Sequence, residues 1–211
     1  MQFSDGPATD EGWETISRDI HFADGHLKVA TEEVLSPECE RSHRWTVVQR
    51  KRAVVIAPLT VDARLVLIRQ ERVPIRAAIW EVPAGQIDAS ADAEIDEIAA
   101  VALRELREET GYQLATGGEL LPLGDFFSSP GFTDERGFCF LARHVELSGD
   151  GHNHQESESI LDCRTFTGAE LKAMILRNDI RDANTLSICA KLLARGMLAF
   201  SGSGNGSAEF F

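Results

Sequence analysis

The most informative stretch of the sequence is residues 104–112, Arg-Glu-Leu-Arg-Glu-Glu-Thr-Gly-Tyr. Apolar residues recur at three- and four-residue spacing before and within it, and this period predicts a helix from Glu94 to Thr110. On that helix Glu105, Glu108 and Glu109 occupy positions i, i+3 and i+4. Side chains at these spacings lie on one face of a helix, so the pattern predicts three adjacent carboxylates.

This carboxylate face has two interpretations. Like charges at such spacing destabilise a helix unless a cation neutralises them, and carboxylate oxygens are preferred ligands of hard divalent cations. Leu103 and Leu106 are expected on the opposite, buried side. The pattern therefore indicates a metal-binding helix, and the alternative is a solvated surface of salt-bridged Arg and Glu.

Length and composition predict a globular protein. The 211 residues are 43% hydrophobic, enough to bury a core without disulfides or metals as staples. No apolar run reaches the length of about 18 residues needed for a membrane span, and Met1–Asp10 lacks a secretory pattern. We therefore expect a cytoplasmic protein without membrane partners. The cysteines are scattered and are expected to be buried hydrophobes: Cys39, Cys139, Cys163 and Cys189.

The charge distribution narrows the class of partner. A formal net charge of −13 argues against nucleic acid, whose phosphate backbone requires a basic surface. Small phosphorylated molecules remain compatible, because clustered carboxylates can hold cations that in turn bind phosphate.

The remaining chain alternates strand and helix patterns, which predicts an α+β fold with a mixed sheet between helices. The predicted strands are Trp13–Phe22, Leu27–Leu35, Trp45–Ala57, Arg64–Arg69, Leu120–Phe127, Gly137–Glu146 and Ile160–Phe166. Two closing helices are predicted at Gly168–Arg177 and Ala183–Arg195. The Gly/Ser-rich end of the chain is expected to be a flexible tail.

Residues 104–112 resemble the second half of the Nudix box, R-E-U-x-E-E-x-G-U, in which U is apolar. Gly85 corresponds to the leading glycine of the box, although the loop from Gly85 to Arg104 is longer than the family pattern. The resemblance implies an α/β/α sandwich with a mixed β-sheet plus a small N-terminal antiparallel sheet. It also implies a division into N-terminal strands at 1–44, a Nudix domain at 45–199 and a tail at 200–211.

The same resemblance assigns roles in a metal site. It implies that Glu105, Glu108 and Glu109 bind Mg²⁺ or Mn²⁺, with the backbone carbonyl of Ala84 as a further ligand. Arg104 would orient these glutamates through a salt bridge, so Glu109 and Arg104 are also expected to be catalytic.

Two further stretches resemble the ADP-ribose pyrophosphatase and ADP-sugar branch of the family. The first is Leu65–Arg72 followed by Trp-Glu-Val-Pro-Ala-Gly at 80–85, and it nominates Arg69, Arg72 and Glu81 for substrate binding. An ion pair of these arginines with Glu71 or Glu81 is the alternative.

The second stretch is Ser-Ser-Pro-Gly-Phe-Thr-Asp-Glu at 128–135, in which Glu135 is a candidate substrate contact. The acidic loop that follows supplies Glu156 as the first candidate for the catalytic base. Glu158 is the second candidate, or a metal ligand.

The implied reaction is Mg²⁺-dependent hydrolysis of the diphosphate of ADP-ribose or a related ADP-sugar, giving AMP and a sugar phosphate. Other nucleoside diphosphate derivatives such as GDP-mannose or NADH remain alternatives, as does a non-catalytic nucleotide-binding module. The N-terminal strands, Trp13–Leu35, resemble the sheet through which this branch forms a homodimer with active sites drawn from both subunits.

Overall fold

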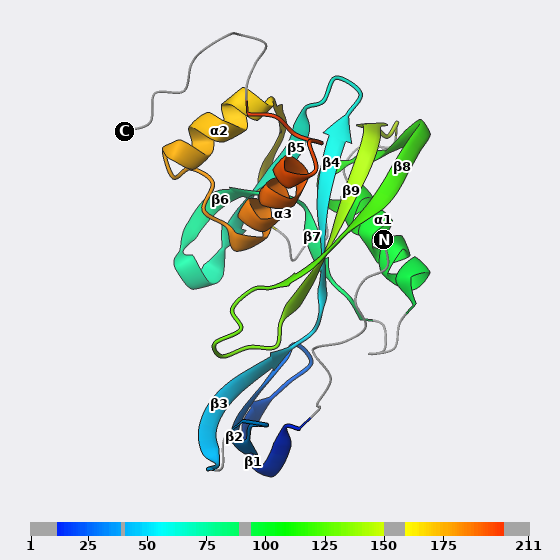
Figure 1. Ribbon diagram of the computed structural model, residues 1–211. Helices are drawn as coiled ribbons and strands as arrows, with labels where there is room; N and C mark the ends of the chain where they lie inside the picture. The colour runs from blue at the N-terminus through cyan, green and yellow to red at the C-terminus, as the bar shows by residue number, and fades with distance from the viewer. Residues whose placement is uncertain (1–11, 39–40, 89–93, 150–158, 201–211) are drawn as a thin grey trace.

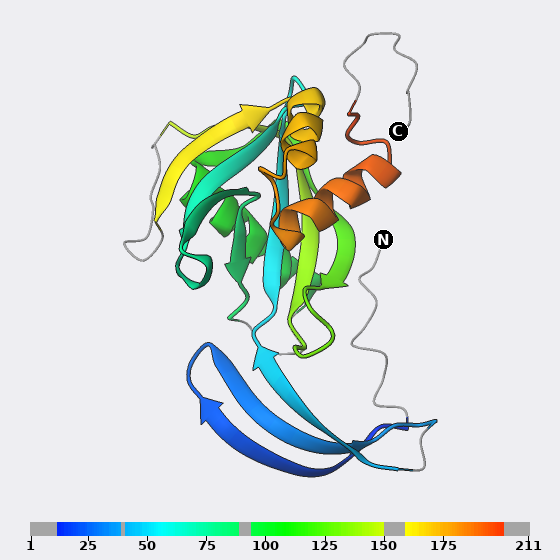
Figure 2. The ribbon, with the colours of Figure 1, turned by 90° about the vertical axis from the view of Figure 1, so that its left-hand side faces the viewer.

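The computed structural model describes residues 12–38, 41–88, 94–149 and 159–200. Within them the chain forms two separate β-sheets and three α-helices (Figure 1). The smaller sheet lies at one end of the body that the larger sheet and the helices form (Figures 1 and 2).

The small sheet is antiparallel and consists of the first three strands in chain order: β1 (Glu14–Ala23), β2 (Leu27–Leu35) and β3 (His43–Arg50). The β1–β2 turn is closed by Asp24, whose carboxylate accepts the N–H groups of His26 and Leu27 at 2.7 and 2.9 Å. These backbone hydrogen bonds lower the pKa of Asp24 below its usual value. The exposed strand β1 is thereby joined by a short turn to the half-buried strand β2.

The large sheet has seven strands in the order β10-β5-β4-β9-β8, with β6 beside β5 and β7 beside β4. It is mixed, because β4 and β9 run parallel while the other pairs are antiparallel. The strands are β4 (Ala53–Thr60), β5 (Leu65–Arg72), β6 (Ala77–Glu81), β7 (Ala84–Gln86), β8 (Tyr112–Phe127), β9 (Arg136–Leu147) and β10 (Ile160–Phe166). A short 3₁₀ turn, Val73–Ile75, joins β5 to β6.

Helices cover both faces of the large sheet. The helix α1 (Ile95–Thr110) packs on one face through Ile98, Ala102 and Leu106. On the other face lie α2 (Gly168–Leu176) and α3 (Ala183–Ala194), whose apolar side chains meet the opposite sides of β4, β5 and β9. The strand β4 is buried on both faces, as expected from its uninterrupted apolar sequence. The predicted α+β sandwich with a mixed sheet and a small antiparallel sheet is confirmed.

Several sequence predictions need correction. The single β-rich segment predicted at 45–57 is two strands, since β3 belongs to the small sheet and β4 to the large one. The strand predicted from Leu120 begins at Tyr112, because a register shift between Leu114 and Glu119 carries the strand past its two glycines. Leu103 was expected to be buried with Leu106 but is 38% exposed.

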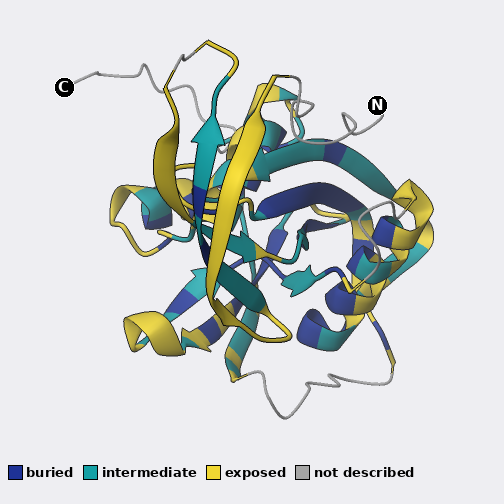
Figure 3. Cartoon of the chain, turned by 90° about the horizontal axis from the view of Figure 1, so that it is seen from below, coloured by how far each residue is buried: buried dark blue, intermediate teal, exposed yellow. Residues whose placement is uncertain are grey.

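The predicted domain boundary after residue 44 falls inside β3, and the division itself stays a prediction. Every residue of β1 is exposed, as Figure 3 shows from the side of the small sheet. Among the described residues, no helix is long and apolar enough to cross a membrane.

Candidate active site

The helix α1 has one apolar face and one carboxylate face, and the latter turns partly inward. Glu105 is 5% exposed and Glu109 is 1% exposed, although both carry ionisable groups. Glu108 is half-buried beside them. A buried ionised carboxylate is costly without cations or hydrogen-bond donors, so this face of α1 requires such partners.

Gly85 lies directly against the carboxylate face. A Cβ atom added to Gly85 would stand 2.0 Å from Cδ of Glu105, a distance that no side chain tolerates. The lack of a side chain at Gly85 therefore leaves the room that the Glu105 side chain occupies where β7 approaches α1. This contact places the predicted leading glycine of the motif next to its first glutamate, despite the long loop between them.

Arg104 joins two of the three glutamates. Its guanidinium donates to Oε1 of Glu105 at 2.5 Å and to Oε2 of Glu108 at 2.7 Å. Partial burial lowers the pKa of Arg104, but the two carboxylates outweigh burial and the pKa lies above its ordinary value. The predicted orienting salt bridge is thus present in the structure.

Glu109 is held by β7. Its Oε2 accepts the backbone N–H of Ala84 at 2.9 Å, so the strand residue nominated as a metal ligand contacts the helix through its amide. Among the described residues, no group of three or more His, Cys, Asp or Glu side chains converges as a preformed metal site. The donor set nevertheless fits a hard divalent cation, since three carboxylates crowd two turns of α1 and two of them are buried.

Arg72 and Glu81 form a close ion pair next to this cluster. Arg72 donates to both carboxylate oxygens of Glu81, with the shortest contact at 2.5 Å, and Glu81 is 2% exposed. Hydrogen bonding to Glu81 raises the pKa of Arg72, to which the charge of Glu109 also contributes. Burial raises the pKa of Glu81, against the opposing effect of Arg72. The arginine therefore lies within electrostatic range of the last turn of α1.

The other nominated substrate residues lie on separate elements. Arg69 is exposed on β5, opposite Asp162 of β10 and Trp80 of β6 in the sheet register. Glu135 ends the loop between β8 and β9, where Arg50 reaches its carboxylate at 3.2 Å. The predicted base residues, Glu156 and Glu158, lie outside the described residues, as does most of the loop before α1.

Sequence reasoning missed the support that α3 gives to the segment 80–85. Thr185, fully buried, accepts the backbone N–H of Val82 at 2.9 Å and donates to Asp182 at 2.8 Å. Asp182 also caps α3 by accepting the N–H of Thr185. The cap was recognisable as a helix start, but its contact with Val82, 103 positions away, carries no local signal.

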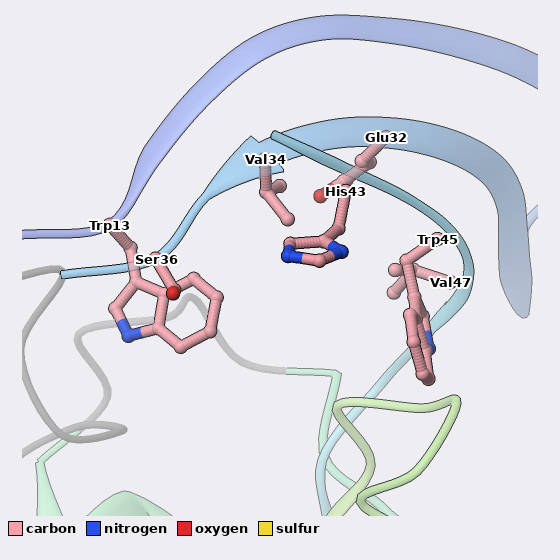
Figure 4. A pocket seen from close by; sticks show the side chains of 7 residues that line it. All are labelled: Trp13, Glu32, Val34, Ser36, His43, Trp45 and Val47. Carbon is pink, nitrogen blue, oxygen red and sulfur yellow. The ribbon is translucent and has the colours of Figure 1, made fainter. Parts of the chain in front are cut away.

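A hollow of about 560 Å³ lies on the small sheet, away from α1 (Figure 4). Trp13 and Trp45 flank it, with Val34 and His43 between them. The remaining lining residues are Glu32, Ser36 and Val47. The hollow is predominantly apolar and offers two flat indole faces.

The described cysteines do not provide a nucleophile. Burial raises the pKa of Cys139 and of Cys163 to about 12, and that of Cys189 to about 11. At neutral pH these thiols are protonated, and a protonated thiol is a poor nucleophile. The carboxylate face of α1 is thus the stronger candidate for catalysis.

Comparison with known proteins identifies the class to which this fold and site belong. Residues 49–187 match the model of the NUDIX domain, and the chain belongs to this family of hydrolases. It is 29% identical to an ADP-ribose pyrophosphatase of Bacillus subtilis over 171 residues, covering 81% of this chain and 87% of that protein. It is 30% identical to an ADP-ribose pyrophosphatase of Mycobacterium tuberculosis over 146 residues, covering 69% and 66%.

Two further similarities complete the comparison. A methanol dehydrogenase activator of Bacillus methanolicus is 29% identical over 172 residues, covering 82% of this chain and 88% of that protein. The crystal structure of an ADP compounds hydrolase superposes with a TM-score of 0.67 at 19% identity, covering 88% of this chain and 97% of the other. This structural likeness supports the fold, and the sequence relatives support assignment as a Nudix hydrolase.

Proposed function

We propose that this Nudix hydrolase cleaves the diphosphate of ADP-ribose or a closely related ADP-sugar, releasing AMP and a sugar phosphate. The observation that carries the proposal is the carboxylate face of α1, where Glu105 closes on Gly85 and shares Arg104 with Glu108. The two ADP-ribose pyrophosphatases among its relatives support the choice of substrate.

Glu105, Glu108 and Glu109 would hold a Mg²⁺ or Mn²⁺ ion. Such an ion neutralises the diphosphate and stabilises the charge that moves onto the leaving phosphate. Arg104 keeps two of the carboxylates oriented, the task that neighbours of metal ligands commonly perform. Arg72, fixed by Glu81, would supply a positive charge within electrostatic range of Glu109 for an anionic substrate.

The small sheet supports a homodimer. The strand β1 is an edge strand exposed along its whole length, and it carries Ile16, Ile20 and Phe22, each more than half exposed. An exposed edge strand offers unpaired backbone groups with which a second chain can pair, and clustered exposed apolar side chains mark association surfaces. We propose that a second copy of this chain covers the exposed strand β1. Trp13 and Trp45 at the hollow on the same sheet would offer stacking surfaces for an adenine base.

A substrate panel tests the proposed function. Steady-state kcat/KM would be measured with Mg²⁺ for ADP-ribose, ADP-glucose, GDP-mannose and NADH, with products separated by chromatography. We expect the highest value for ADP-ribose, with AMP and ribose 5-phosphate as products. Faster turnover of GDP-mannose or NADH would contradict the substrate assignment, and no turnover of any with Mg²⁺ or Mn²⁺ would favour a binding module.

A further inference from the structure

The loop between β8 and β9, residues 128–135, is hydrogen-bonded along β3 of the small sheet. The N–H of Val48 donates to the carbonyl of Phe132 at 2.8 Å, and the indole N–H of Trp45 donates to the carbonyl of Gly131 at 2.9 Å. Val48 and Thr133 form a parallel bridge, while β2 pairs with the other edge of β3. The loop therefore acts as an additional strand at the free edge of the small sheet.

Asp134 ends this series of contacts. Its Oδ1 accepts the backbone N–H of Arg50 at 2.8 Å, which fixes the loop where β3 ends. The next residue, Glu135, is held from two sides: Nη1 of Arg50 lies 3.2 Å from its Oε1, and Oγ of Ser128 donates to its Oε2 at 2.7 Å. The Ser128 amide also donates to the Glu135 carbonyl, which closes the loop at its base.

The sheet register places this loop at the end of the molecule that carries the carboxylate cluster. Gly137, two residues after Glu135, pairs with Ala53 of β4. Ala53 pairs on its other side with Gln86, adjacent to Gly85. The start of β9 and the β7 segment that touches Glu105 therefore lie at the same end of the large sheet, on either side of β4.

We propose that Asp134 is a positioning residue, which locks residues 128–135 onto β3 and thereby fixes Glu135 for substrate binding. The inference rests on the proposed function. It gives the small sheet a second role beyond the proposed subunit contact, because residues of β3 donate hydrogen bonds to Gly131, Phe132 and Asp134 of the loop. The role needs a short hydrogen-bond acceptor at position 134 and not a negative charge.

The test compares Asp134→Ala with Asp134→Asn, whose amide oxygen can accept the same backbone N–H. Asp179→Ala, an exposed aspartate between α2 and α3, serves as the control. We expect Asp134→Ala to raise KM about tenfold, the effect of one lost hydrogen bond to a carboxylate, with kcat changed less than about twofold. Asp134→Asn should stay within about twofold of wild type in both constants.

Hydrogen–deuterium exchange supplies a readout independent of turnover. In Asp134→Ala the amides of 46–50 and 128–135 should exchange faster, and in Asp134→Asn they should exchange at the wild-type rate. Wild-type kinetics in Asp134→Ala, or an equal loss of activity in both variants without faster exchange, would overturn the proposal. If Asp134→Ala does not fold, a tenfold loss of activity in Asp134→Asn would by itself overturn the proposal. A wild-type enzyme inactive on every nucleotide would refute the proposed function, while exchange would still test the loop contact.

Discussion

At the scale of single residues, the pair formed by Arg72 and Glu81 shows how a buried charge is tolerated beside the site. Glu81 is 3% exposed at its side chain and Arg72 is 41% exposed, so one partner is shielded and the other meets solvent. Removing Arg72 leaves the buried Glu81 carboxylate without its ion pair. That carboxylate then favours its protonated form, because burial alone raises its pKa.

We predict that Arg72→Ala destabilises the protein in a pH-dependent way. The folded-state pKa of Glu81 is already raised above 4.5 and rises further in the variant. A group with a raised folded-state pKa stabilises below its unfolded pKa and loses that contribution as pH rises. The difference in Tm from wild type should be small near pH 4 and larger at pH 7. The loss at pH 7 should be about 2 kcal/mol, less than for a fully buried pair because Arg72 meets solvent.

Thermal unfolding by circular dichroism across this pH range provides the measurement. Arg69→Ala, which removes an exposed arginine from the same strand, is the matched control and should show a small, pH-independent shift. A constant Tm difference for Arg72→Ala from pH 4 to 7 would contradict the linkage to Glu81.

At the scale of elements, the sequence predicted α1 closely because its apolar period, its acidic face and its terminal glycine all agree. Gly111 adopts the left-handed conformation at φ 71° that ends the helix, as the pattern indicated. The carboxylate face was predictable for the same reason, since i, i+3, i+4 spacing is local. The contacts that hold this face and the neighbouring segment in place could not be predicted. Gly85 with Glu105, and Thr185 with Val82, join elements that are distant in the sequence.

Gly85→Ala should separate β7 from α1. The added Cβ would overlap the Glu105 carboxylate, so either the side chain leaves its place or the strand shifts. We expect kcat/KM to fall at least tenfold, since small displacements of catalytic groups have large effects on rate. Steady-state kinetics would measure this, with Gly25→Ala as the control because its Cβ would meet nothing within 4 Å. Unchanged kinetics in Gly85→Ala would show that catalysis does not need the close packing of β7 against α1.

Thr185→Val should weaken the support that α3 gives to the segment 80–85. The substitution keeps the volume but leaves the Val82 amide without its hydroxyl acceptor in a fully buried environment. An unmet buried donor costs about 1–3 kcal/mol, so urea unfolding should give a free energy of unfolding lower by that amount. Thr185→Ser retains the hydroxyl and should recover part of the loss. Equal stability of the valine and serine variants would contradict the role of this hydrogen bond.

At the scale of the whole molecule, the sequence predicted both sheets but not how they are joined. The strand pattern indicated two successive strands at Trp13–Phe22 and Leu27–Leu35, and the family resemblance implied a separate small sheet. The crossing of the chain from β3 to β4 was missed, because residues 45–57 are continuously β-rich and the change of sheet leaves no gap in the pattern. The attachment of the loop 128–135 to β3 was missed too, since parallel bridging between distant segments has no local signature.

The exposed edge of the small sheet predicts self-association. We expect sedimentation equilibrium to give twice the 23.2 kDa chain mass for the wild type. Ile20→Lys places a charge on β1 and should weaken the dimer at least tenfold, because charged residues on edge strands block pairing. Val61→Lys is the control, because Val61 is 73% exposed on the turn that joins β4 to β5 in the large sheet. A dimer of unchanged affinity in Ile20→Lys would place the interface elsewhere.

The most direct test of the carboxylate cluster is AMP release from ADP-ribose and Mg²⁺ by wild type and Glu109→Gln, with Glu97→Gln as the control. Glu97 lies exposed on the first turn of the same helix, whereas Glu109 is buried against β7. We predict that Glu109→Gln loses at least about a hundredfold in kcat/KM while keeping its fold, and that Glu97→Gln matches wild type. Full activity in Glu109→Gln would contradict α1 as the catalytic metal platform.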